Sequence, residues 1–348
     1  MKRILFIALV IVFSCNTHSD IPQVSSIKIN LTTQRFEQDF FAIDTAQLTS
    51  SLNNLFNKYP HFSKDFISNL LGLSVDSVLV PNSNQQKAIR LFIHDYKQVK
   101  DASDKLYKNF DKETSEIKSA LQFVKYYFPS YELPKSIFTF IAPLDANFLT
   151  SFGVQGDILT SEGLGIGLQL HLGSQYSLYN SEEGQTIYPL FISANFDQPH
   201  IVVNCMHNIV DDIFPEKPSG KPLIEQMVEK GRKQFLLTKF LPRTKENIIL
   251  GYSESQMKEV LKNEPLIWDF FLKNDLLNNS EQDIIQNYIS VGPSTPELGT
   301  GAPGNLGTFT GLQIVKKFMG KNPKTSITEL MKMDTREIYS LSKYKPKI

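Results

Sequence analysis

One nine-residue segment contains the residue types of a metal site, Asn204-Cys205-Met206-His207-Asn208-Ile209-Val210-Asp211-Asp212. Zinc metallopeptidases of the H-E-x-x-H type carry two histidine ligands one helical turn apart, with a glutamate general base beside the first. This chain has His207, Asn208 and Asp211 at that spacing. An asparagine amide takes up no proton at neutral pH, and an aspartate in place of the second histidine makes a poorer zinc site. The segment therefore predicts no bound metal, no cofactor and no catalytic residue.

Four polar residues of this segment share one side of a helical wheel, opposite an apolar stripe. They are Asn204, His207, Asn208 and Asp211. The simplest interpretation is a solvated or hydrogen-bonded helix edge, with His207 and Asp211 paired at i, i+4. A degenerate metal site and a contact surface for a protein or ligand are the two alternatives.

Glu229 is a further candidate, because it lies 22 residues after His207, in the region where many such peptidases carry a glutamate ligand. Its i+4 neighbour is Lys233, so a surface ion pair explains it equally well. The stretch Gly299-Thr300-Gly301-Ala302-Pro303-Gly304 matches a nucleotide-binding pattern by its letters, but no βαβ unit precedes it and Pro303 lacks an N–H. It predicts a tight loop with close backbone approach before a helix. Cys205 lies on the apolar flank of its helix and is expected to be inert.

The elements that position these residues follow from hydrophobic periodicity. Apolar residues at helical spacing predict an N-terminal helical layer over residues 29–133, and a β-rich run over 136–142 predicts a strand. Runs at 154–160 and 165–172, joined by Ser161-Glu162-Gly163, predict a hairpin with one buried face.

Helical periodicity returns after the hairpin, over the remainder of 134–348. It predicts helices at 198–214 and 222–241, and capping boxes begin helices at Ser253 and Ser326. The fold class is therefore α+β, mostly helical, with a small sheet and a β-hairpin packed against helices. The order of hairpin and candidate helix also suggests a zincin-like architecture without an intact metal motif.

The start of the chain reads as a lipoprotein signal peptide, residues 1–14, with a basic start, a short apolar region and Ser14 before Cys15. Cys15 is the predicted lipidation site, modified by acyl chains such as palmitate, and 15–28 is the lipidated tether of a single domain over 29–348. An ordinary secretory signal with an accidental cysteine is the alternative.

Composition limits the class of partner. The 36 basic residues balance 36 acidic ones, so no electrostatic field favours nucleic acid. Cys205 is the only cysteine besides Cys15, which rules out an intramolecular disulfide in the exported chain. Beyond the signal region, no segment approaches the ~20 apolar residues of a membrane span.

The chain resembles the gliding-motility lipoprotein GldB family in seven blocks that follow one order along the sequence. The blocks are Arg35-Phe36-Glu37-Gln38-Asp39-Phe40-Phe41, Leu172-Gly173-x-x-Tyr176, Asn208-Ile209-Val210-Asp211-Asp212, Gly220-Lys221-Pro222-Leu223-Ile224-Glu225-Gln226-Met227, Asn263-Glu264-x-x-Ile267-Trp268, Pro303-Gly304-x-x-Gly307 and Ser342-Lys343-Tyr344-Lys345-Pro346. The resemblance implies a distant relative of zinc-metallopeptidase folds whose motif is degenerate, a pseudo-peptidase.

The resemblance also implies a function: a non-catalytic lipoprotein that supports assembly or stability of the gliding machinery and its type IX secretion system. The implied partners are other gliding and secretion proteins of the cell envelope, together with the membrane through the lipid. The surface-export tag of a serine and several acids is absent from Asn16-Thr17-His18-Ser19-Asp20, which favours the periplasmic face of the inner or outer membrane. A divergent zinc-metallopeptidase-like hydrolase is one alternative. A small-ligand binding module, with a pocket lined by Tyr176, Asn204 and His207, is the other.

Overall fold

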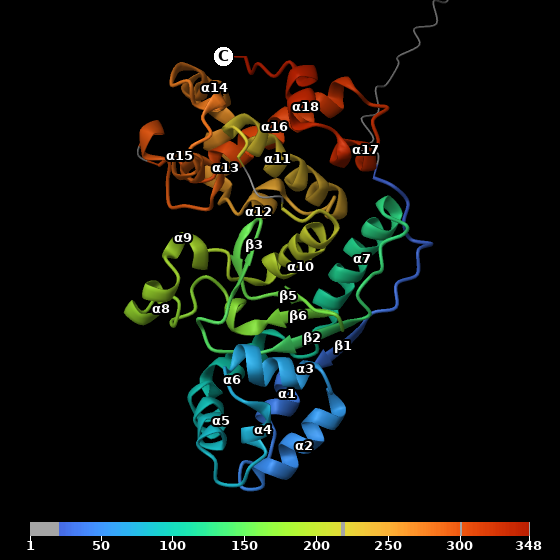
Figure 1. Cartoon of the computed structure of the whole chain (residues 1–348), viewed down its shortest axis with the longest axis vertical. Coiled ribbons are helices and arrows are strands. Elements are labelled where there is room, and N and C mark those ends of the chain that lie inside the picture. Colours follow the sequence, from blue (N-terminus) through green and yellow to red (C-terminus); the bar gives the residue numbers. More distant parts are fainter. Residues whose placement is uncertain (1–20, 217–219, 300, 348) are drawn as a thin grey trace, which may run out of the picture.

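The computed structural model describes residues 21–216, 220–299 and 301–347. The predicted signal peptide and Cys15 lie outside the described residues. Figure 1 shows an elongated molecule with a small sheet near its middle, the N-terminal helices at one end and the C-terminal helices at the other. The candidate helix α10 (Gln198–Ile213) lies between the sheet and the C-terminal helices.

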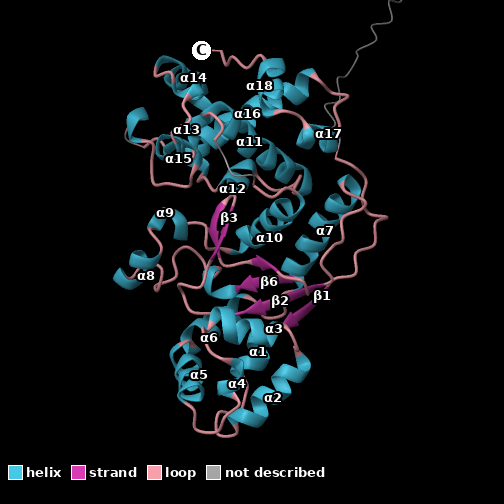
Figure 2. Ribbon diagram, in the orientation of Figure 1, coloured by secondary structure: helices cyan, strands magenta, loops and turns pink. Residues whose placement is uncertain are grey.

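Four short strands form a mixed sheet in the order β1-β2-β6-β5. Their bounds are β1 Thr32–Arg35, β2 Ser136–Phe140, β6 Leu164–Gly167 and β5 Ile158–Leu159. The first three are parallel, and β5 pairs antiparallel with β6 at the edge. A separate two-stranded hairpin joins β3 (Phe148–Thr150) to β4 (Gly153–Gln155), as Figure 2 shows.

The sheet confirms the strand predicted over 136–142 and corrects the prediction of its neighbours. The N-terminal layer contains strand β1 as well as helices. The predicted hairpin is real but short, because only Ile158 with Gly165 and Leu159 with Leu164 are paired, and the chain turns into a 3-10 helix at Leu168–Leu170. All four residues of β6 are buried, so the expected single buried face is wrong. An interior strand with a core on each face carries no polar side.

The N-terminal helices cover one face of the sheet and continue to its other face through α7 (Figure 1). Phe138 and Phe140 of β2 pack in a cluster with Phe36 and Phe62, whereas Ile137 packs in the core that contains α7. Alternate residues of one strand thus enter different cores. The helices are α1 Phe36–Phe41, α2 Leu48–Lys58, α3 Phe62–Asp65, α4 Val75–Val78, α5 Asn84–Asp95, α6 Lys97–Leu106 and α7 Asp111–Tyr127, with a π-helical turn at Phe66–Leu70.

The C-terminal half is helical, as predicted. The helices other than α10 are α8 Glu182–Ile187, α9 Leu190–Ser193, α11 Leu223–Phe240, α12 Glu246–Leu250, α13 Glu254–Lys262, α14 Glu264–Lys273, α15 Gln282–Ile289, α16 Leu306–Lys321, α17 Ile327–Lys332 and α18 Thr335–Ser342. Both capping boxes, at Ser253 and Ser326, are formed. Trp268 is 6% exposed in the core of this half. Within the described residues, no helix is long and apolar enough to cross a membrane.

Helices α11 and α16 pack at very short distance because glycines face each other. A Cβ atom at Gly231 would lie 2.1 Å from the carbonyl carbon of Gly311, and one at Gly311 would lie 1.7 Å from the carbonyl oxygen of Met227. Ahead of α16, a Cβ at Gly304 would lie 2.4 Å from the carbonyl oxygen of Gly292. This confirms the close backbone approach predicted for the end of the glycine-rich loop.

Candidate functional site

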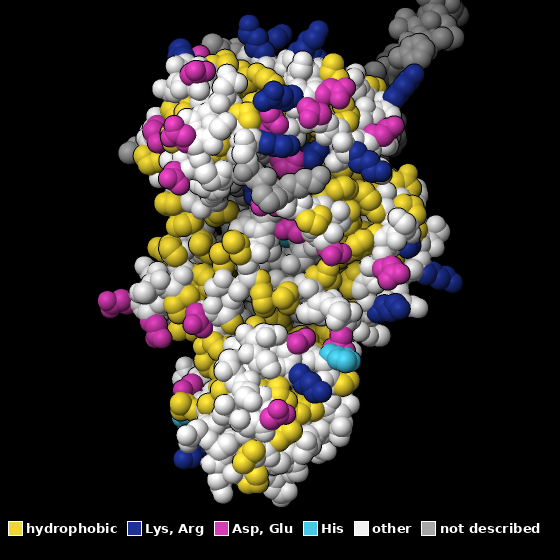
Figure 3. All heavy atoms as spheres, viewed as in Figure 1, with side chains coloured by type: hydrophobic (Ala, Val, Ile, Leu, Met, Phe, Trp, Pro, Cys, Tyr) yellow, Lys and Arg dark blue, Asp and Glu magenta, His cyan; other side chains and the backbone are white. Residues whose placement is uncertain are grey.

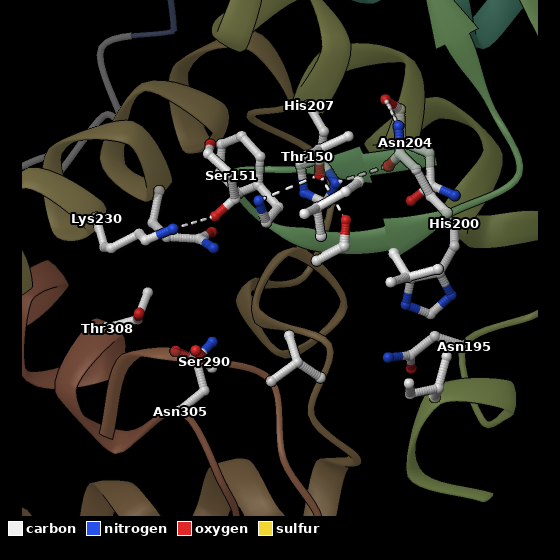
Figure 4. A pocket seen from close by; sticks show the side chains of 18 of the residues that line it. Thr150, Ser151, Asn195, His200, Asn204, His207, Lys230, Ser290, Asn305 and Thr308 are labelled. Atoms are coloured by element: carbon white, nitrogen blue, oxygen red, sulfur yellow. Dashed lines mark hydrogen bonds between the residues drawn. The ribbon is translucent and has the colours of Figure 1, made fainter. Parts of the chain in front are cut away.

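A cavity of about 420 Å³ separates the β3–β4 hairpin and α10 from the C-terminal helices. Figure 3 shows the surface hollowed between these parts of the molecule, with apolar side chains around it. The hairpin supplies Leu149 to Gly156, and α10 supplies His200, Asn204 and His207. Figure 4 shows these α10 residues on one wall, with Asn305 and Thr308 on the opposite wall.

The turn of the β3–β4 hairpin is bound to two helices through Ser151. Asp211 on α10 accepts a 2.7 Å hydrogen bond from the Ser151 backbone N–H and another from its hydroxyl. The ammonium group of Lys233 on α11 lies 2.9 Å from Asp211 Oδ1 and 3.2 Å from Ser151 Oγ, and its side chain is fully buried. Lys230 donates to the Ser151 carbonyl and forms a 2.5 Å ion pair with Glu216 (Figure 4 shows the first contact).

These contacts correct two predicted pairs. Asp211 binds Ser151 and Lys233 rather than His207, and Glu229 pairs with Arg232 rather than with Lys233. Helical spacing alone favoured partners four residues apart. The buried Lys233 on α11 instead pairs with Asp211 on α10. A serine beside a lysine can form a catalytic dyad when the lysine acts as a neutral base. Here Lys233 is held in an ion pair, so the group serves as a structural clamp.

A second polar cluster lies behind the cavity wall, around Asp157. The carboxylate of Asp157 accepts from the backbone N–H of Gly167 (3.0 Å) and from Asn204 Nδ2 (2.9 Å), and lies 2.8 Å from His171 Nε2. His171 Nδ1 lies 3.1 Å from the Asp197 carbonyl oxygen, so both ring nitrogens face acceptors. Burial alone would lower the pKa of His171, but the Asp157 carboxylate and the hydrogen bonds raise it overall.

Sequence reasoning missed this pair, which is fully buried. The available signal was weak: His171 falls on the polar phase of the run 165–172, and Asp157 lies within the run 154–160. A hairpin with one buried face would place the polar phase outward. The two residues meet because Asp157 directly precedes β5, whose partner β6 ends at Gly167, four residues before His171.

His207 itself is packed rather than coordinated. Its ring stacks on Phe152 with centroids 4.1 Å apart, and Nδ1 lies 3.3 Å from Gln155 Oε1. Burial lowers the pKa of His207 to about 3, so the ring is neutral at physiological pH. The next residue, Asn208, donates its amide N–H groups to the carbonyl oxygens of Asp157 and Asn204, each at 3.2 Å. Burial also raises the pKa of the Cys205 thiol, which agrees with the expected inertness.

The arrangement does not fit zinc. Of the H-E-x-x-H positions, Asn208 presents an amide N–H group to carbonyls, and Asp211 is already neutralised by Lys233. Among the described residues, no group of three or more His, Cys, Asp or Glu side chains could hold a metal ion. Tyr176 packs edge-on against Tyr179 and is not part of the cavity lining, so only Asn204 and His207 of the predicted pocket residues line it.

Comparison with known protein families gives a match over nearly the whole chain. The family described as "Gliding motility protein GldB" matches residues 17–346, which includes the cavity, the clamp and the Asp157 cluster. No curated protein and no solved structure matches this chain.

Proposed function

This chain belongs to the gliding motility protein GldB family, and from that premise we propose that it acts without catalysis, in assembly or stability of the gliding machinery and its type IX secretion system. The family identifies a gliding-motility lipoprotein. The proposed partners are other gliding and secretion proteins of the cell envelope, reached from the periplasmic face of a membrane to which Cys15 is attached by lipid.

The observation that carries the non-catalytic role is the clamp at Ser151. A peptidase needs a proton acceptor beside its first histidine and free ligands one turn later. Here Asn208 stands where the proton acceptor would be. The Asp211 carboxylate is already bound to Ser151 and to the buried Lys233. Side chains arranged to hold a hairpin against two helices support a scaffold role.

A zincin-like ancestry agrees with the topology. The antiparallel edge strand β5 is the part of the sheet beside α10, the helix that carries the degenerate motif. We propose on this ground that the scaffold derives from a peptidase fold whose site was converted into the clamp.

The lipid anchor would orient the molecule. Figure 1 shows the described chain beginning at the end that carries α17 and α18, opposite α2, α4 and α5. Val24 is buried in the core, so only a short stretch separates Cys15 from the folded body. The six residue-to-residue steps from Cys15 to Ile21 span at most ~20 Å. We therefore propose that α17 and α18 face the membrane and that the N-terminal helices point toward partners.

The test is genetic complementation in cells that lack this protein, which should fail to glide and should deliver less adhesin to the surface. A copy carrying Asn208→Ala should restore gliding at normal protein level, whereas Cys15→Ser should leave the protein outside the membrane fraction. Loss of gliding in the Asn208→Ala strain, with normal abundance and membrane attachment, would contradict the scaffold role and favour chemistry at this site.

The hydrolase alternative is tested by elemental analysis of purified protein after incubation with zinc and removal of the excess. We expect less than stoichiometric metal, because the nearest carboxylate is already paired. One zinc per chain that is lost in a His207→Phe variant would overturn that expectation.

A further inference from the structure

The cavity wall contains buried polar atoms for which the described residues supply no hydrogen-bond partner. Four of them belong to lining residues: His200 Nε2, His207 Nε2, Gln234 Oε1 and Asn305 Oδ1. Gln234 is only 4% exposed. A buried polar atom without a partner raises the free energy of the folded state, so such groups in one cavity point to a ligand that satisfies them.

The hydrogen-bond network shows that His207 Nε2 is an acceptor. Gln155 Nε2 donates to the carbonyl oxygens of Asp157 (3.1 Å) and Asn204 (3.4 Å), which leaves Gln155 Oε1 facing His207 Nδ1. An amide oxygen only accepts, so His207 Nδ1 carries the proton. In a neutral ring the other nitrogen then has a free lone pair.

Two more of these atoms are acceptors, because Gln234 Oε1 and Asn305 Oδ1 are amide oxygens. The fourth atom, His200 Nε2, belongs to a ring whose Nδ1 lies 2.6 Å from Asp197 Oδ1. The three acceptors require donors from a ligand.

The charges of the lining residues indicate that the ligand is uncharged. Only Lys230 and Glu216 are charged among the described lining residues, and they pair with each other. A cationic amine would find no free carboxylate, and an anion would face three acceptors. A peptide carries one backbone N–H donor per residue, whereas a sugar ring carries several hydroxyl donors within a small volume.

The remaining wall is apolar and suits a compact ligand. Phe152, Phe196 and Val291 line the cavity, whose volume of about 420 Å³ lies within the range of small-molecule sites. Sugar rings combine hydroxyl donors with apolar C–H faces.

We propose that this cavity binds a neutral, hydroxyl-rich ligand, a sugar unit, through acceptors on α10, α11 and the start of α16. The acceptor atoms lie within the wall, so a hydroxyl reaches them when the side chains turn toward the cavity. Gln234 can do this readily because its side chain has three rotatable bonds. The site is independent of the scaffold role proposed above.

The experiment uses the full-length lipoprotein in a detergent without a sugar headgroup. Saturation-transfer NMR and titration calorimetry are performed with glucose and N-acetylglucosamine, and with putrescine and inorganic phosphate as charged probes. We expect at least one sugar to bind with a Kd of about 1 to 10 mM and neither charged probe to bind.

Gln234→Met keeps the shape of the side chain and removes the acceptor. It should weaken sugar binding about tenfold and leave the unfolding midpoint unchanged or higher, because an unpartnered buried acceptor is lost. Gln226→Met is the matched control: Gln226 lies on the same helix, outside the cavity, and donates to the Lys221 carbonyl oxygen. It should leave binding unchanged.

His207→Phe gives an independent check, because it keeps a ring against Phe152 and removes the acceptor; the same loss of binding is expected. Three results would each overturn the proposal. The wild type binds no sugar, or it binds phosphate or putrescine instead, or both cavity variants keep full sugar binding.

Discussion

The ammonium group of Lys233 lies 2.9 Å from the carboxylate of Asp211, and the lysine side chain is wholly buried. This ion pair joins α11 to α10 and, through Ser151, to the β3–β4 hairpin. Three elements that line the cavity are therefore held by one charged group.

Breaking this pair should cost stability. Lys233→Met leaves the Asp211 carboxylate without its cation, and we expect a loss of about 3 kcal/mol in the free energy of unfolding, measured by urea denaturation. Lys239→Met on the same helix is the control, since Lys239 lies over the Phe235 ring and has no ion pair among the described residues. Equal effects of the two changes would show that the clamp contributes nothing. Adding Asp211→Asn to Lys233→Met should recover part of the loss.

Acid should destabilise the protein partly through His207. The pKa of His207 is lowered to about 3 in the folded state, whereas an unfolded histidine titrates near ~6.5. Between these values the unfolded chain binds more protons, so stability falls as the pH drops through that window. His207→Phe should reduce the slope of unfolding free energy against pH in this window by up to ~1.4 kcal/mol per pH unit. Urea unfolding at several pH values measures this slope. An unchanged slope would contradict the buried neutral ring.

His171 should act in the opposite direction. Its pKa is raised by the Asp157 carboxylate, so the folded state holds a proton that the unfolded chain loses above pH ~6.5. The stabilisation is fully present below that pH and is lost as the pH rises through the folded-state pKa. Histidine NMR of the native protein should show a ring still protonated above pH ~6.5, and the signal should be absent in His171→Gln. A ring that titrates at or below the ordinary value would contradict the ion pair.

The contact between α11 and α16 should tolerate no side chain. Gly311→Ala places a methyl group where the Met227 carbonyl oxygen already lies, and we expect a loss of about 3 kcal/mol in stability. Gly320→Ala, on the same helix in open space, should instead stabilise by about 0.5 to 1 kcal/mol through helix propensity. Thermal unfolding of both variants measures the difference, and similar midpoints would mean that the helices can separate at no cost.

Local features of the fold could be predicted from the sequence. The bounds of α10 and α11 and the capping boxes at Ser253 and Ser326 follow from contiguous residues. Periodicity and caps depend on neighbours within about one or two helical turns, so they are visible without tertiary structure. Strand β1 was missed because a four-residue strand has too few positions to show a period of two.

By itself, the sequence determined that the H-E-x-x-H positions lack a proton acceptor, because residue 208 is an asparagine wherever it lies in space. Only the tertiary structure decided the partners: Asp211 meets Ser151 from 60 positions away and Lys233 from 22, and Asp157 meets His171 from 14. Helical spacing instead predicted His207 as the partner of Asp211 and Glu229 as the partner of Lys233. The reason is energetic: a buried charge must be paired, and its partner is the group that packing brings within reach rather than the one nearest in sequence.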